Sequence, residues 1–264
     1  MANTPTKAQI TPGFLAAHAI SIFLLITIAK AALGFKDITE ALAFYGVYHR
    51  NKWNQLLHFF GVPGIIWSLL IFFAHLRIPT PKQMRAEISI PGIPTHSLSY
   101  ATVLSLGYLL FYLKIDAFGG TLYAPFVYSM YRSAVIMCAN DQDKAAAAAI
   151  TAREKKEDDA SSSSTTLVSW TGTGGALKTA ALIHVLSWYV QIHPGHKILE
   201  GAAPAITQSF GGALTSAPLF AFYEGLWALG INAQLLERTQ GLVAEYTAEL
   251  CQAGSSMRAC ADFV

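Results

Sequence analysis

The sequence contains few charged residues, and this scarcity narrows the possible classes of protein at once. Only 13% of the 264 residues are Asp, Glu, Lys or Arg, whereas soluble domains carry roughly 25%. Hydrophobic residues make up 53% of the chain, and the mean hydropathy is +0.40. The formal net charge is only +2, so the chain lacks the strongly basic character typical of nucleic-acid binding. The composition therefore predicts an integral membrane protein in the lipid bilayer, with no nucleic-acid partner.

Cysteine is also scarce, and several familiar catalytic motifs are missing. Cys138, Cys251 and Cys260 are an odd, scattered set without a CxxC pair, so we expect neither a disulfide framework nor a thiolate zinc site. The chain has no glycine-rich phosphate loop, HExxH motif or serine nucleophile elbow, and we expect no nucleotide cofactor. It also lacks the HxxxH and HxxHH boxes of di-iron lipid hydroxylases and desaturases.

Long apolar runs predict an all-α fold, a polytopic membrane helix bundle. Phe14 to Leu33 is a nearly uninterrupted run of about 20 residues, which is long enough to cross a bilayer. His58 to Leu76 is a second spanning candidate, and the runs 99–113 and 123–138 predict a tight helical hairpin. We divide the chain into an additional N-terminal membrane helix (1–35), a first half of a membrane catalytic core (36–139), a low-complexity loop (140–175), a second half of the core (176–240) and a C-terminal surface tail (241–264).

The segment 140–175 differs in composition from its surroundings. It contains a five-alanine run, a charged stretch from Arg153 to Asp159, four serines and a Gly/Thr stretch. Segments that are poor in large apolar residues cannot bury enough surface to offset the entropy of ordering. We therefore expect a disordered loop, placed on the cytosolic side by its Lys and Arg content.

Four of the eight histidines lie in two short segments that also carry amide side chains. In the first segment His49 and His58 are nine residues apart, which would place them on opposite faces of a straight helix. Asn51 can end one helix and Asn54 can cap the next. The sequence therefore predicts a helix–turn–helix in which His49 and His58 face each other. Polar groups at bilayer depth are costly, which makes them candidates for a functional site.

The second segment places Pro194 and Gly195 between His193 and His196. Proline disfavours helical geometry in the residue before it, so we expect a bend that turns both imidazoles into one cavity. Glu200 follows His196 by four residues and would share its face if a helix resumed. We expect Glu200, and also Gln191, to orient an imidazole.

Other polar residues in apolar surroundings have simpler interpretations. We interpret His18, His75 and His96 as packing or interfacial residues. His184, on an apolar helix, is a second choice for a fourth metal ligand after His193. Glu224 lies inside an apolar run, where a carboxylate requires a partner. Imidazole ligands suit zinc, copper, iron and nickel, and the spacing does not choose among these metals.

The segment from Phe44 to His58 with Gly61-Val62-Pro63 resembles the first signature of a known family, the 2-hydroxy fatty acid dioxygenases of the fungal and plant endoplasmic reticulum. The segment from Trp188 to Ala205, and Ala217-Pro218-Leu219-Phe220 with Glu224, resemble its second and third signatures. The resemblance covers roughly residues 36 to 240. The chain departs from the pattern at Ile192-His193-Pro194, where one residue and one histidine are added.

The resemblance implies an Fe(2+) enzyme that acts on a 2-hydroxy fatty acid and dioxygen in the α-oxidation arm of phytosphingosine breakdown, in a multi-pass endoplasmic reticulum membrane protein. We expect His49, His58 and His196 as metal ligands, with His193 as the first choice for the fourth. We expect His49, His58, His196 and Glu200 as catalytic residues, and Asn54, Gln191 and Glu224 as residues that contact the cofactor.

Two alternatives stay open on the sequence. A zinc-dependent membrane lipid hydrolase would use the same imidazoles, because zinc accepts three histidines and a water molecule. A non-enzymatic membrane adaptor or lipid carrier would need no metal at all.

Overall fold

The computed structural model describes residues 12–78, 87–158, 174–255 and 260, and 81% of it is helical. The described part of the chain contains eight α-helices, one π-helix, one 3-10 helix and a two-stranded antiparallel sheet. In chain order these elements are α1 (Pro12–Gly34), α2 (Ile38–Gly46), α3 (Lys52–Ala74), β1 (Glu87–Ile88), β2 (His96–Ser97), α4 (Tyr100–Ile115), α5 (Ala117–Asp158), α6 (Gly175–Val190), η2 (Gln191–Glu200), η3 (Ala205–Thr207), α7 (Phe210–Ala228) and α8 (Ala233–Gln252).

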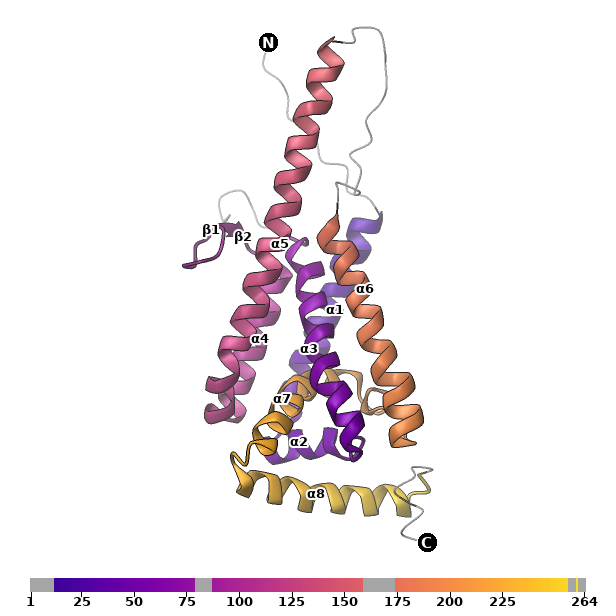
Figure 1. Cartoon of the computed structure of the whole chain (residues 1–264). Helices are drawn as coiled ribbons and strands as arrows, with labels where there is room; N and C mark the ends of the chain where they lie inside the picture. The colour runs from indigo at the N-terminus through magenta and orange to yellow at the C-terminus, as the bar shows by residue number, and fades with distance from the viewer. Residues whose placement is uncertain (1–11, 79–86, 159–173, 256–259, 261–264) are drawn as a thin grey trace.

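Helix α3 lies at the centre of the bundle. It packs against α4, α5, α6, α7 and η2, and Figure 1 shows α1, α3, α4 and α6 running along the length of the molecule. Helices α2 and α8 lie across one end of the bundle and pack against each other (Figure 1). Both histidine segments lie toward this end, at the start of α3 and at the end of α6. The fold therefore brings together two motifs that are far apart in the sequence.

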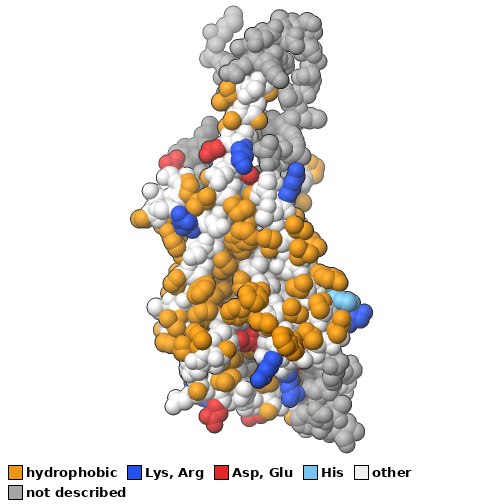
Figure 2. Space-filling model, in the orientation of Figure 1, with side chains coloured by type: hydrophobic (Ala, Val, Ile, Leu, Met, Phe, Trp, Pro, Cys, Tyr) orange, Lys and Arg blue, Asp and Glu red, His pale blue; other side chains and the backbone are white. Residues whose placement is uncertain are grey.

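Two helices, Leu15–Gly34 within α1 and Lys52–Ala74, are long and apolar enough to cross a membrane. Large apolar side chains are also exposed on the outside of the bundle: Phe23 on α1, Leu110 on α4 and Val185 on α6 are each more than 60% exposed. In the view of Figure 2, hydrophobic side chains cover the middle of the molecule, and most charged ones lie toward its two ends. Such broad apolar surface is unusual on a monomeric soluble protein.

The predicted hairpin between the two shorter apolar runs is confirmed. The chain breaks only at Asp116, whose carboxylate accepts hydrogen bonds from the backbone amide of Gly119 (2.8 Å) and from the Tyr223 hydroxyl. Gly119, Gly120 and Pro125 lie inside α5 and do not form the turn.

The prediction of a disordered loop over 140–175 is wrong for its first half. Helix α5 continues to Asp158, because alanine has the highest helix propensity and the Arg, Lys and Glu residues that follow are also good helix formers. Residues 159–173 lie outside the described part of the chain. The boundary that we placed at residue 240 falls inside α8, a continuous amphipathic helix that packs on α2.

The scattered cysteines did not indicate a disulfide framework, but the structure contains one disulfide. Cys251 and Cys260 form a disulfide with their Cα atoms 5.3 Å apart, and Cys138 is buried as a free thiol. Helix α8 ends at Gln252, and Gly254 has a φ of +85°, the left-handed conformation that commonly terminates a helix. The spacing of the cysteines alone carried no sign of this pairing.

Candidate metal centre

The first histidine segment folds as a helix, a tight turn and a second helix, as predicted. Helix α2 ends at Gly46, and the backbone amides of Tyr48 and His49 bond to the carbonyls of Tyr45 and Gly46 in the turn. The cap of α3 is Asn51 and not Asn54: its side-chain oxygen accepts from the backbone amides of Trp53 (2.9 Å) and Asn54 (3.3 Å). The prediction that Asn54 caps α3 is thus wrong. The side chain of Asn54 instead donates to the carboxylate of Glu200.

Three buried histidines meet at this turn. The ring centroid of His49 lies 4.3 Å from that of His58 and 4.7 Å from that of His196, and the last two are 5.0 Å apart. Each side chain offers one nitrogen to a cluster in which all three lie within 4.8 Å of one another. Each residue is 2–3% exposed. We call His49, His58 and His196 the histidine triad.

Backbone carbonyls fix two of the three imidazoles. Nδ1 of His49 donates to the carbonyl of Tyr45 (2.7 Å), and Nδ1 of His58 donates to that of Asn54 (2.8 Å). Since a carbonyl only accepts, each Nδ1 carries the proton, and Nε2 is left with a free lone pair. Metal-binding histidines in proteins usually have this arrangement.

Unpartnered nitrogens support the same assignment. Nε2 of His49 and Nδ1 of His196 are buried and have no hydrogen-bond partner among the described residues. Nearly all buried polar atoms in proteins have a partner, and the binding of an ion is one of the accepted explanations for an exception. The residues present therefore fit a divalent metal held by three imidazoles.

The electrostatic setting keeps the triad in its metal-binding form. Burial lowers the pKa of His49 well below its ordinary value, and the neighbouring His58 and His196 lower it further. Burial and the proximity of His58 lower the pKa of His196 to about 3. Both imidazoles are thus neutral at neutral pH, and neutral imidazole is the form that ligates metals.

The second histidine segment forms a π-helix without the predicted bend. Helix α6 runs directly into η2, which ends at Gly201 with a φ of +63°. Gly195 lies against α3 so closely that an added Cβ would come within 2.5 Å of Oδ1 of Asn54. Pro194 is accommodated in the widened helix, and the glycine allows His196 to reach the triad.

His193 and His184 do not join the triad, contrary to their candidacy as the fourth ligand. His193 is exposed and stacks on Tyr189, with ring centroids 5.6 Å apart. In a π-helix the hydrogen bonds join residues five positions apart, so positions 193 and 196 do not share a face. His184 bonds to the Ser68 hydroxyl (2.9 Å) and accepts from the Trp188 indole N–H (3.1 Å).

Glu200 binds backbone and amide groups and no imidazole, which corrects the expectation for its side chain. Its carboxylate accepts from the backbone amides of Arg50 (2.7 Å) and Asn51 (3.0 Å) and from Nδ2 of Asn54 (3.0 Å). Hydrogen bonds to a carboxylate are stronger than those between neutral groups. Glu200 therefore connects the turn that carries His49 to the helix that carries His196.

The remaining predicted residues lie around the triad in different ways. Asn54 is fully buried, and its Oδ1 has no partner among the described residues. Gln191 is buried beside the triad and donates to the carbonyl of Ser187 (2.8 Å). Glu224 has two buried carboxylate oxygens without a hydrogen-bond partner in the described part of the chain.

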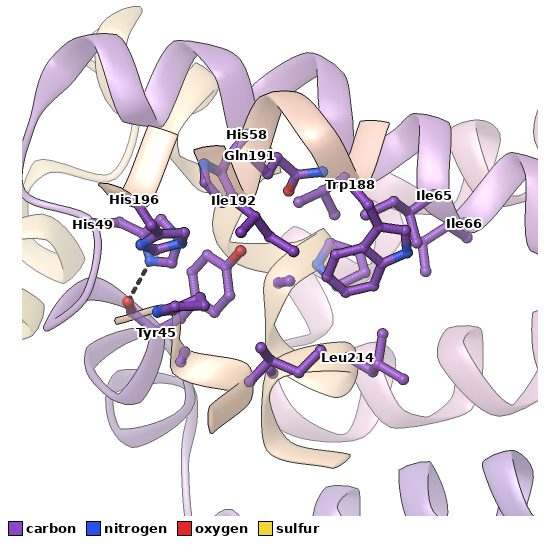
Figure 3. A pocket seen from close by; sticks show the side chains of 17 residues that line it. Tyr45, His49, His58, Ile65, Ile66, Trp188, Gln191, Ile192, His196 and Leu214 are labelled. Atoms are coloured by element: carbon purple, nitrogen blue, oxygen red, sulfur yellow. Dashed lines mark hydrogen bonds between the residues drawn. The ribbon is translucent and has the colours of Figure 1, made fainter. Parts of the chain in front are cut away.

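A small cavity opens beside the triad. It has a volume of about 40 Å³ and is lined mainly by apolar side chains of α3, η3 and α7. Figure 3 shows the three histidines gathered on one side of it and Trp188, Ile65 and Ile66 on the other. Since one water molecule needs roughly 10–15 Å³, the cavity has room for dioxygen or a few water molecules.

Tyr45 and Trp188 are site residues to which sequence reasoning assigned no role. Tyr45 stacks on His49 with ring centroids 3.8 Å apart and an angle of 8° between the planes. Tyr45 precedes His49 by four positions, a spacing that places two side chains on one helix face, and this spacing was the signal in the sequence for their contact. Trp188 lines the cavity from α6.

Comparisons with known proteins place the chain in a family. No curated protein and no solved structure shows significant similarity to this sequence. The sequence model described as 2-hydroxy-palmitic acid dioxygenase Mpo1-like matches residues 35–227. This match covers most of the chain and includes all three triad histidines, and the protein therefore belongs to the Mpo1-like family.

Proposed function

We propose that this protein is an iron(II)-dependent dioxygenase that shortens 2-hydroxy long-chain fatty acids by one carbon. The observation that supports the proposal most strongly is the triad of buried, neutral imidazoles with unpartnered nitrogens in a chain of this family. His49, His58 and His196 would hold the metal. Three imidazoles leave further coordination positions for substrates.

The proposed reaction balances without an external reductant. A 2-hydroxy acid, R–CH(OH)–COOH, and one dioxygen give R–COOH, carbon dioxide and water. The bond between C1 and C2 breaks, C2 becomes the new carboxyl carbon, and the four electrons released reduce dioxygen. A bound iron(II) ion would supply Lewis acidity toward the carboxylate and hydroxyl groups and the redox chemistry that dioxygen requires.

The chain's own residues would prepare the site for this chemistry. The backbone carbonyls of Tyr45 and Asn54 hold the imidazoles of His49 and His58 in one tautomer. Glu200 keeps the two histidine segments together. The apolar cavity beside the triad would admit dioxygen and exclude bulk water. Asn54 and Gln191 border the triad with amide groups, and we propose that they contact the bound head group.

We propose further that the protein is a multi-pass protein of the endoplasmic reticulum membrane and serves phytosphingosine degradation. The broad exposed apolar surface and the two helices of membrane-crossing character support the membrane location. The whole of α1 precedes the region matched by the family, which supports its interpretation as an additional membrane helix (Figure 1).

The ligand set alone would also suit zinc, which activates water when three histidines bind it. Purification under anaerobic conditions in detergent, followed by quantification of iron and zinc, separates the two functions. We expect iron, and an iron-dependent fatty acid one carbon shorter when 2-hydroxypalmitate and dioxygen are added. Bound zinc without a shortened product would overturn the dioxygenase proposal and favour a lipid hydrolase.

A further inference from the structure

The cavity beside the triad is too small for a fatty acid. Its volume of about 40 Å³ is an order of magnitude below the roughly 300–1,000 Å³ typical of sites for drug-sized ligands. If the proposed function is correct, the acyl chain must lie elsewhere, in a space that reaches the triad.

A second hollow meets this condition. It has a volume of about 880 Å³ and lies between α2, α3, α7 and α8, and His49 forms part of its wall. His49 lines both this hollow and the small cavity, so the two spaces meet at this residue. We call the larger hollow the α8 groove, because α8, which lies across one end of the bundle (Figure 1), forms one of its walls.

The walls of the α8 groove are amphipathic. Large apolar side chains from three helices line it, and positions 236, 240, 243, 244 and 247 place one continuous face of α8 along it. Arg50 and Lys52, directly after His49, contribute cationic groups. Neither has an ion-pair partner among the described residues. The large apolar residues are Leu56, Phe59, Phe220, Trp227, Leu236 and Val243.

We propose that the α8 groove binds the acyl chain of a long-chain carboxylic acid and that Arg50 and Lys52 attract its carboxylate to the edge of the triad. This inference rests on the proposed function for the identity of the acid. The groove's volume, its single cationic side and its contact with His49 match an amphipathic acid that presents its head to the metal and its tail to α7 and α8.

A third hollow competes for the same role. It has a volume of about 650 Å³, borders His196 and contains Lys197. Its large apolar and aromatic lining consists of Tyr48, Ile192 and Leu250, with Pro204 beside them, so it offers less surface to an alkyl chain. Lys197 therefore provides a matched charge control.

The first test measures binding of tritiated 2-hydroxypalmitate to the metal-free full-length protein in detergent, with tritiated hexadecanol as the uncharged probe. We expect the Arg50→Gln/Lys52→Gln variant to lose affinity for the acid at least tenfold and to keep its affinity for hexadecanol. Lys197→Gln should bind both probes like the wild type. Absence of acid binding to the wild type, or an equal loss in Lys197→Gln, would overturn the proposal.

The second test narrows the groove. Ala244→Trp adds a large side chain to the groove face of α8, whereas Ala233→Trp makes the same change at an exposed position of α8 outside the groove. We expect Ala244→Trp to shift the ratio of turnover on 2-hydroxyoctanoate to that on 2-hydroxypalmitate at least tenfold toward the shorter acid. Iron content should equal that of Ala233→Trp.

The outcomes separate the groove from the reaction. If the metal-free protein binds the acid and Ala244→Trp weakens binding, but no shortened acid forms with iron and dioxygen, the groove is supported and the proposed function fails. If the shortened acid forms and Ala244→Trp has the chain-length preference of Ala233→Trp, the groove proposal fails and the proposed function stands.

Discussion

The carboxylate of Glu200 accepts a 2.7 Å hydrogen bond from the backbone amide of Arg50, which lies 150 positions earlier in the chain. The same carboxylate binds the amide of Asn51 and the side chain of Asn54. His49 precedes these residues directly, and His196 lies four positions before Glu200. One side chain thus sets the separation of two triad members without contacting either imidazole in the hydrogen bonds described.

Replacement of Glu200 by Ala tests this relationship. The change leaves the backbone amides of Arg50 and Asn51 and the amide of Asn54 without their acceptor, which should lower the free energy of unfolding by about 2–3 kcal/mol. Metal affinity should fall roughly 10–100-fold, as it does when other supporting groups are removed from metal sites. Thermal unfolding and metal titration measure the two effects.

Glu245→Ala is the matched control, since Glu245 is exposed on α8. Wild-type metal affinity in Glu200→Ala would show that the turn and η2 hold their separation without this contact.

Single alanine substitutions of the triad should remove the metal. His49→Ala, His58→Ala and His196→Ala each delete one of three ligands, so we expect metal content below a tenth of the wild type and no turnover. His193→Ala deletes an exposed imidazole three positions from His196 and should keep both metal and activity. Loss of metal from His193→Ala to the same extent would refute the three-histidine assignment.

Gly195→Ala should disrupt the site through its backbone. The added Cβ would lie 2.5 Å from Oδ1 of Asn54, so η2 and α3 must separate, and overpacking of this kind costs about 1–3 kcal/mol. Because His196 is the next residue, metal content should fall as well. Differential scanning calorimetry and metal analysis report the two losses.

Gly241→Ala serves as the comparison, because nothing lies within 4 Å of the added Cβ there. Inside α8 this change should raise stability by up to about 1 kcal/mol. A destabilisation in Gly241→Ala equal to that in Gly195→Ala would contradict the steric explanation.

The disulfide between Cys251 and Cys260 makes a prediction that requires no activity assay. In unfolded, non-reduced protein only Cys138 should react with an alkylating reagent, whereas all three cysteines should react after reduction. Mass spectrometry of the intact chain counts the modified thiols. Three reactive thiols before reduction would show that the disulfide does not form in the purified protein.

Local chemistry made part of the site predictable. His49 and His58 are nine positions apart, and a continuous helix would have placed them on opposite faces, so an asparagine-capped turn was the arrangement that could join them. The preference of asparagine for helix caps is a local property, which is why the break was predicted correctly even though the cap itself is Asn51.

The rest of the site depended on contacts between segments that are far apart in the sequence, which local patterns do not indicate. Pro194 and Gly195 indicated a bend by local rules, but α6 continues as a π-helix because Gly195 lies against Asn54 on α3. The bond between Glu200 and Arg50 likewise follows from the packing of η2 on α3. The charged end of α5 is the opposite case. Its low complexity indicated disorder, but its residues have a high intrinsic helix propensity, and the segment is helical to Asp158.

The most direct test of the central claim is the stoichiometry of the reaction in protein reconstituted with iron(II) under anaerobic conditions. The account predicts one pentadecanoic acid and one carbon dioxide per dioxygen consumed from 2-hydroxypalmitate, with no activity in protein loaded with zinc. Oxygen-independent turnover of a lipid by the zinc-loaded protein, without pentadecanoic acid from the iron-loaded protein, would contradict it.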